Sequence, residues 1–251
     1  MIRFIFALVV LTTTQIAAQS TRLNTDAKGI IYNKEKALDA RIHTHGWAAN
    51  FLAGDIQSYY KTTQWHFGIG ELRHHKEVRK STDPTNVPSQ SFRQYTYGKQ
   101  NFAYVLRGGY GMKRYFTEKA AKNGVALAVT YSGGLTTALM VPYYIEVGGP
   151  RDTKTTSIKY TEDTKLDFLN PLKVKGKSSI LKGIGETKII PGIHGQIGVH
   201  LDWGAFDEFM RAVEAGIMID IFPKKLPIMV SEENRPYFFN LYVSLQLGKR
   251  N

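Results

Sequence analysis

Cysteine is absent from this chain of 251 residues. Its absence excludes disulfide bonds, thiol chemistry and a lipid-accepting cysteine near the N-terminus. The chain also lacks a continuous apolar run of roughly 20 residues, the length that a helix needs to cross a bilayer, so no transmembrane helix is expected. Common catalytic motifs are missing too. No serine stands in a Gly-x-Ser-x-Gly setting, and no glycine pair opens a helix after a strand as a phosphate-binding loop does.

The N-terminus has the pattern of an export sequence. Arg3 precedes a short apolar run, residues 4–11, and small residues end at Ala18. This order is typical of a secretory signal peptide, whereas a membrane anchor helix would need a longer apolar run. We therefore predict a signal peptide over 1–18 and a single domain over 19–251. An exported chain without disulfides suits a bacterial envelope.

The charge balance indicates which partners to expect. The formal net charge is +12 at pH 7. A basic protein can meet nucleic acid, but export favours lipid phosphates and anionic polysaccharide instead. The predicted partners are outer-membrane lipid and lipopolysaccharide, and no nucleic acid.

Alternation of apolar and polar residues is the main pattern that is present. Near the C-terminus, apolar residues from Tyr237 to Leu247 take every second position, and mostly polar or small residues lie between them. A period of two predicts strands with two different faces. Seven segments show this pattern clearly: 37–53, 62–73, 101–110, 125–141, 193–203, 208–222 and 237–248. In the first of them the register is unclear, and a bulge near Gly46 is expected.

These segments predict a transmembrane barrel. Each reaches the roughly 9–11 residues that a tilted strand needs to cross a bilayer. In lipid every backbone amide must be paired within the protein, so strands can cross only as a closed barrel. Bacterial single-chain barrels have even strand numbers, which makes Gly29–Tyr32 the expected eighth strand, closing against the last one. Side chains fill the interior of a barrel this small, which disfavours the alternative of a narrow solute pore.

The connections alternate in length. Short ones are expected at 54–61, 111–124 and 204–207, and long ones at 80–99, 149–186 and 223–235. Short periplasmic turns and long extracellular loops are the known asymmetry of outer-membrane barrels. The prediction is thus an all-β, transmembrane antiparallel β-barrel of eight strands in the bacterial outer membrane.

A soluble exported barrel or sandwich is the alternative fold. It would hold the apolar face inside and place the histidine and carboxylate face in water. The polar faces are rich in glycine, alanine and serine, which suit a narrow filled lumen better than a solvated surface. We therefore expect the apolar face outside.

Three stretches carry a resemblance to a known family: YGKQNFAYVLRGGYGMKRYF, GVHLDWGAFDEFMRAVEAGIMIDIFPKKLPIM and NLYVSLQLGKR. They resemble small outer-membrane β-barrel proteins of Bacteroidota-type bacteria. The resemblance implies a barrel fold and an outer-membrane location. It implies no reaction, because no established catalytic motif comes with it.

The inward faces supply the candidate site. Charges in a low-dielectric interior must be paired, so a lumen polar network is expected. Its predicted members are Arg41, His43, His45, His66, Arg107, His194, His200, Asp202, Glu214 and Asp220.

An enzyme acting on lipid or lipopolysaccharide is the alternative function. It would draw on His43, His45, His200 and Asp202, because a catalytic base needs a carboxylate to orient it. His43 and His45 also suggest a metal pair, but alternate residues share a face in every strand. No metal, cofactor or catalytic residue is therefore predicted.

The loop Pro223–Arg235 suggests a partner site. It carries an apolar run on a segment expected to face outward: Leu226, Ile228, Met229 and Val230. An exposed apolar run needs cover, which predicts that a protein partner docks there. The alternative is a lid that folds against Ile180, Leu181 or Ile184. The predicted function is non-enzymatic, with a structural or partner role in envelope assembly or secretion machinery.

Overall fold

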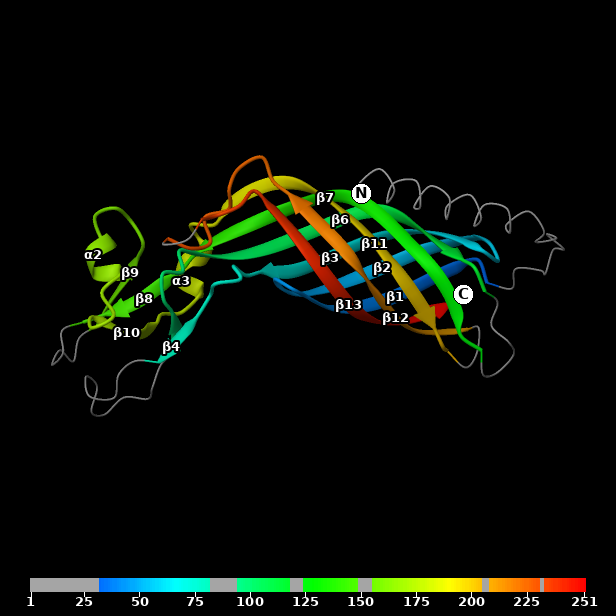
Figure 1. Cartoon of the computed structure of the whole chain (residues 1–251), viewed down its shortest axis with the longest axis horizontal. Helices are drawn as coiled ribbons and strands as arrows, with labels where there is room; N and C mark the ends of the chain where they lie inside the picture. The colour runs from blue at the N-terminus through cyan, green and yellow to red at the C-terminus, as the bar shows by residue number, and fades with distance from the viewer. Residues whose placement is uncertain (1–31, 82–93, 118–123, 149–154, 205–207, 231–232) are drawn as a thin grey trace, which may run out of the picture. The chain divides into compact units, whose positions relative to one another are not determined.

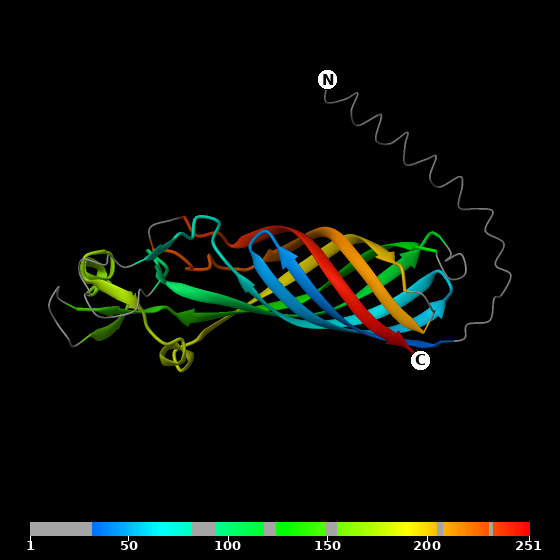
Figure 2. The same cartoon turned by 90° about the horizontal axis from the view of Figure 1, so that it is seen from below.

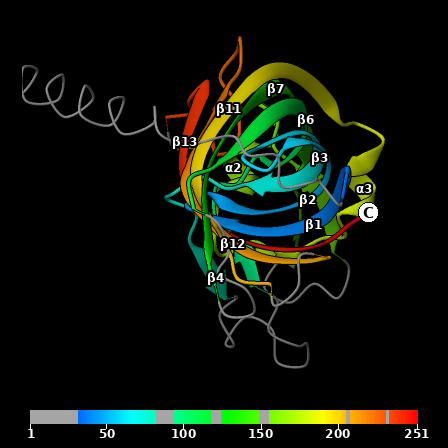
Figure 3. The same ribbon diagram turned by 90° about the vertical axis from the view of Figure 1, so that its right-hand side faces the viewer.

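Eight antiparallel strands close into a barrel in the computed structural model (Figure 1). Hydrogen-bonded neighbours follow the order β1-β13-β12-β11-β7-β6-β3-β2, with β2 returning to β1. Figure 3 shows the strands as a closed ring. The predicted all-β barrel of eight strands is confirmed. The strands are β1 (Lys34–His43), β2 (Gly46–Ser58), β3 (Lys61–Leu72), β6 (Asn101–Tyr115), β7 (Ala126–Pro142), β11 (Lys188–Asp202), β12 (Phe209–Ile221) and β13 (Tyr237–Arg250).

The structure describes residues 32–81, 94–117, 124–148, 155–204, 208–230 and 233–251. They belong to one unit, Tyr32–Asn251. The predicted signal peptide lies outside the described residues. None of the helices within those ranges has the length and apolar composition needed to cross a membrane.

The closing strand is not the predicted one. The segment 37–53, expected as one strand with a bulge, is the β1–β2 hairpin, and β1 pairs with β13 to close the barrel. The turn is only two residues, and the backbone of Gly46 after it has φ +145°, which favours glycine. Tyr32 lies before β1 and in no strand, and residues 29–31 are outside the described part. A two-residue turn shifts the phase of the alternation, which is why the sequence suggested a bulge.

The register fixes the strand tilt. Following hydrogen-bonded partners once around the barrel from His43 leads back to β1 at Asn33, an offset of ten residues. In a barrel of eight strands this offset corresponds to a tilt of about 40°. Inward side chains at this diameter meet across the axis and fill the interior.

The two ends of the barrel differ. At one end, here called the turn end, short connections join β2–β3, β6–β7 and β11–β12, and β13 finishes there. At the other, the loop end, long connections join β3–β6, β7–β11 and β12–β13. The predicted alternation of lengths is confirmed, except that the β1–β2 turn, Thr44–His45, adds a two-residue connection at the loop end.

The barrel is apolar outside and polar inside. On β13, Val243, Leu245 and Leu247 face outward and are exposed, while Ser244 and Gln246 face inward and are buried. The same alternation runs through β1, where Leu38 and Ile42 are outside. A soluble barrel would have the opposite arrangement, so that alternative is wrong. Apolar outward faces around a polar interior are the pattern of a transmembrane barrel.

A small folded body lies at the loop end, at the left of Figure 1 and Figure 2. It is built around a buried cluster of Tyr95, Tyr143, Ile145, Phe168 and Val174. This cluster ties the hairpin, the sheet and the first helix together. Its elements are the hairpin of β4 (Arg79–Ser81) and β5 (Gln94–Thr96), the sheet of β8 (Tyr144–Val147), β9 (Thr156–Lys159) and β10 (Val174–Lys177), and the helices α2 (Lys165–Phe168) and α3 (Leu181–Ile184).

The predicted partner-docking loop is buried. Leu226, Ile228 and Met229 are 0–3% exposed, and they pack with Leu72, Val105, Ala138, Met140 and Phe238 inside the loop end of the barrel. Val230 is half-buried beside the cluster of the loop-end body. The exposed docking surface predicted from this run is therefore wrong. The barrel interior changes from polar to apolar at this end, and that lining needs apolar cover.

The lid alternative is also wrong in its contacts. Leu181 and Ile184 are exposed, and the cluster around Leu226 contains neither of them nor Ile180. The segment 226–230, here called the plug, is held by backbone hydrogen bonds instead. Gln100 N donates to Ile228 O at 2.8 Å, and Val230 N donates to Gly98 O at 2.8 Å.

Truncating a buried side chain of the plug should destabilise the barrel. We expect Leu226→Ala to lower the free energy of unfolding by about 2–5 kcal/mol, because it leaves a cavity at a fully buried site. Val230→Ala, at a half-buried site, is the matched control and should cost clearly less. Urea unfolding of the protein in lipid vesicles measures both. An unchanged midpoint for Leu226→Ala would show that the plug does not contribute to stability.

Candidate functional site

The barrel interior is filled by ion pairs that cross it. Near the loop end, Arg107 on β6 makes a bidentate pair with Asp220 on β12: Nε donates to Oδ1 and Nη2 to Oδ2, both at 2.8 Å. Both residues are 5% exposed or less. Two parallel charge-assisted bonds fix the relative position of the two strands.

The second layer centres on Arg41. Its Nη2 donates to Asp39 Oδ2 at 2.8 Å, and its guanidinium carbon lies 4.0 Å from the centre of the Tyr242 ring. Glu214 accepts hydrogen bonds from the Tyr242 hydroxyl at 2.6 Å and from Gln246 at 3.0 Å. Three strands, β1, β12 and β13, therefore meet in this layer.

The third layer closes the turn end. Glu35 pairs with Lys113 at 2.8 Å and with Arg250 at 2.9 Å. Arg250 also pairs with Asp202 at 3.0 Å and donates to the hydroxyl of Tyr115 at 3.2 Å. These side chains leave almost no exposed surface inside the barrel.

The histidines form separate contacts. Nε2 of His66 and Nε2 of His194 lie 2.7 Å apart. His43 and His45 both place Nδ1 near Oδ1 of Asn240, at 3.1 and 2.8 Å. His45 belongs to the β1–β2 turn and is only half-buried, so it lies at the mouth and not in the lumen.

The four residues considered for catalysis do not form one group, because His43 and His45 share Asn240 while His200 and Asp202 lie on β11. His200 has its Nδ1 3.5 Å from Glu214, while Asp202 is bound to Arg250 and to the backbone N of Gly204. No base–carboxylate pair therefore joins His200 to Asp202. Within the described residues, no group of three or more histidine, cysteine or carboxylate side chains is arranged to hold a metal ion.

The sequence located many interior positions and missed others. Of the ten predicted lumen residues, all except His45 are buried. Glu35, Asp39, Lys113 and Arg250 were missed. The alternation along the strands could have found three of them. Glu35 and Asp39 lie an even number of residues from Arg41, and Lys113 lies an even number from Arg107, so each shares the inward face.

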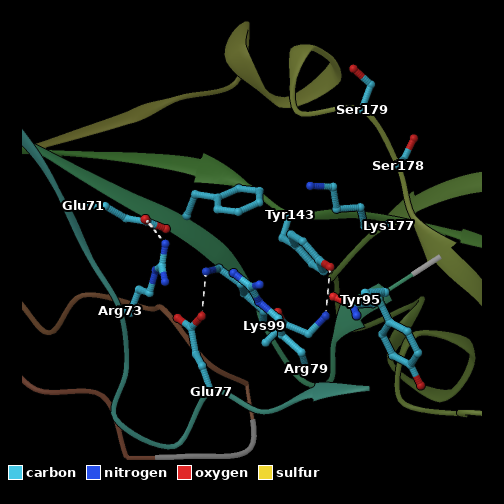
Figure 4. Close-up of a pocket in the computed structure, with 13 residues that line it drawn as sticks. Glu71, Arg73, Glu77, Arg79, Tyr95, Lys99, Tyr143, Lys177, Ser178 and Ser179 are labelled. Atoms are coloured by element: carbon cyan, nitrogen blue, oxygen red, sulfur yellow. Dashed lines mark hydrogen bonds and ion pairs between the residues drawn. The ribbon is translucent and has the colours of Figure 1, made fainter. Parts of the chain in front are cut away.

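A second candidate site is a cavity of about 920 Å³ at the loop end, here called the loop-end cavity (Figure 4). Residues from the end of β3, from β4 and β5, from the start of β6 and from β10 surround it. Its walls combine charge, hydroxyl groups and aromatic rings. The lining consists of Glu71, Arg73, Glu77, Arg79, Gln94, Tyr95, Thr96, Lys99, Phe102, Tyr143, Lys177, Ser178 and Ser179.

The carboxylates of the loop-end cavity are neutralised. Arg73 pairs with Glu71 at 2.6 Å, and Lys99 pairs with Glu77 at 2.8 Å (Figure 4). Nearby carboxylates raise the pKa of Arg73 further above its usual range, and the largest cause is the hydrogen bond that Arg73 donates to Glu71. The other two cations of the lining, Arg79 and Lys177, take part in no ion pair among the residues that the structure describes.

Tyr143 fixes the wall of the cavity. Its hydroxyl accepts a hydrogen bond from the backbone N of Thr96 at 3.0 Å and so ties β5 to the end of β7. Burial raises the pKa of Tyr143, which keeps the hydroxyl neutral. The ring packs edge-to-face against Phe102, with centroids 5.2 Å apart. The cavity wall is thus a packed structure and not a set of loose side chains.

Comparison with known proteins finds distant similarity to solved structures and no family. No protein-family model and no curated protein matches the chain. Among solved structures, it is similar to Neisserial surface protein A, with 8% identity over 88% of this chain and 97% of that chain and a TM-score of 0.38. It is also similar to the translocator domain of the autotransporter NalP from Neisseria meningitidis, with 11% identity, 96% and 97% coverage and a TM-score of 0.27. At these values, the conclusions about this chain depend on its own register and burial.

Proposed function

We propose that this chain is a small integral protein of the bacterial outer membrane, with a structural or partner role in envelope assembly or secretion machinery. The observation that carries the proposal is the barrel itself, apolar outside and closed inside by ion pairs. Such an outer surface is stable only in lipid, and a barrel is the form in which strands cross a membrane. By the asymmetry of such barrels, the loop end faces outward from the cell and the turn end faces the periplasm.

The filled interior argues against the other functions. A solute pore needs a continuous path, but charged and polar side chains with almost no exposed surface meet at three levels of the barrel. An enzyme needs a base that its substrate can reach and a carboxylate that orients it. His43, His200 and Asp202 are buried, and His45, half-buried at the mouth, contacts the amide oxygen of Asn240. A structural or partner role needs neither. The folded loop-end body, with its own buried cluster, supplies a surface outside the membrane for such a role.

The location test uses two measurements on the full chain. The protein should fractionate with the outer membrane, and its electrophoretic mobility should shift on heating, because a closed barrel stays folded in the electrophoresis detergent until it is heated. Release into the soluble periplasmic fraction would contradict the proposal. Co-purification from gently solubilised membranes tests the partner role, and recovery of the chain alone would count against it.

A further inference from the structure

The position of the loop-end cavity relative to the bilayer follows from the outward face of β2 and β3. On this face Phe51, Phe67 and Ile69 are exposed and apolar, as lipid contact requires. Trp47, the first outward residue after the β1–β2 turn, donates from Nε1 to Glu71 at 3.1 Å. Tryptophan with an apolar ring and a bonded N–H is typical of the membrane interface. The edge of the hydrocarbon layer therefore lies near Trp47 and Glu71.

The loop-end cavity begins at this edge and extends away from the lipid. Glu71 lines it, and Arg73 and Glu77 follow in the connection after β3. Lys99 precedes β6 by two residues, beyond the end of the β3–β6 pairing. The cavity thus lies at the height of lipid headgroups, where the phosphates and sugars of outer-leaflet lipopolysaccharide are found.

The charges of the cavity suit an anion. Its two carboxylates are each held by a cation, so an incoming anion meets no unpaired negative charge. Arg79 and Lys177 then give the lining a surplus of two positive charges among the described residues. A guanidinium and an ammonium group both bind phosphate, the first through paired N–H donors.

The rest of the lining suits a saccharide. Gln94 and Ser179 present an amide and a hydroxyl group at exposed positions, which can bind sugar hydroxyls. Phe102 is half-buried and supplies apolar ring surface to the cavity, in front of the buried rings of Tyr95 and Tyr143. A cavity of about 920 Å³ has room for a ligand of the size of a disaccharide.

We propose that the loop-end cavity binds a phosphorylated saccharide, with Arg79 and Lys177 as its anion-binding groups. The inference rests on the proposed function, which places the loop end on the outer side of the membrane. It adds a class of ligand for the loop-end cavity. The phosphorylated saccharide is either the headgroup of lipopolysaccharide in the same membrane or a free sugar phosphate.

The test measures dissociation constants for the full chain, folded in detergent for the soluble probes and inserted into the nanodiscs for the membrane probes. The soluble probes are glucosamine 1-phosphate and inorganic phosphate. The membrane probes are phosphatidylcholine nanodiscs with and without lipopolysaccharide. The variant is Arg79→Gln with Lys177→Gln. The matched control is Lys165→Gln with Lys224→Gln, which removes the same charge from exposed positions outside the cavity.

We expect the cavity variant to weaken binding roughly 10- to 30-fold, since each cation near a lipid phosphate contributes about 1 kcal/mol. The control should stay within about twofold of the wild type. Binding to lipopolysaccharide nanodiscs alone would identify the membrane as the source, and binding to glucosamine 1-phosphate as well would include free sugars. Equal weakening in both variants would overturn the proposed site. An affinity for inorganic phosphate equal to that for glucosamine 1-phosphate would overturn the proposed saccharide ligand.

Insertion of the protein into vesicles distinguishes failure of the ligand proposal from failure of the proposed outer-membrane role. The same samples are inserted into vesicles and tested for the mobility shift on heating. A protein that inserts and shifts but binds neither probe contradicts only the ligand proposal. A protein that fails to insert contradicts the outer-membrane role, whatever it binds.

Discussion

Arg107→Leu should lower the free energy of unfolding by about 3–5 kcal/mol, because it leaves the carboxylate of Asp220 buried without its bidentate partner. The interior is a low-dielectric site, so an unpaired charge there is far more costly than on the surface. Urea unfolding in lipid vesicles, followed by tryptophan fluorescence, measures the change.

Two further variants test the cause of this loss. Arg107→Leu with Asp220→Leu removes both charges and should recover most of the stability, since a buried ion pair replaced by apolar residues is often neutral. Lys173→Leu breaks a half-exposed pair with Asp167 in the loop-end body and should cost at most about 1 kcal/mol. If the double variant is no more stable than Arg107→Leu, the loss comes from packing and not from the unpaired charge.

The second large effect concerns the outer face. Ile197→Arg places a charge near mid-strand on β11, where Ile197 is exposed on the apolar face. We expect a loss of about 2–4 kcal/mol in the unfolding free energy, the usual cost of arginine at the bilayer midplane of a barrel.

Val125→Arg is the control for depth. Val125 is also exposed, but it precedes β7 at the turn end, where the cost should fall to about 0–1 kcal/mol. Equal costs at the two positions would mean that this face of β11 does not contact lipid. Measuring both in vesicles of the same lipid removes differences in bilayer thickness.

The sequence alone determined which way most side chains point. In β13, the alternation from Tyr237 onward placed Val243 outside and Ser244 inside, as observed. Side-chain direction in a strand depends only on position along that strand, so a local pattern is sufficient. The fold class followed from the same pattern, because alternating strands of membrane-spanning length in an exported chain require a closed barrel.

Only the tertiary structure decided which inward charges meet. Arg107 and Asp220 are 113 residues apart, and Glu35 reaches both Lys113 and Arg250. These pairings depend on the ten-residue offset and the tilt of the closed barrel, which no single strand specifies.

The plug and the β1–β2 hairpin also could not be predicted from local sequence patterns. Leu226 and Ile228 looked exposed because their neighbours in sequence are polar, but their place is set by the apolar lining of the barrel end, contributed by distant strands. The Thr44–His45 turn was hidden for a related reason: a two-residue turn leaves a continuous run of strand-forming residues in the sequence. Local patterns specify faces, whereas closure, pairing across the axis and the filling of the ends are set by strands far apart in the chain.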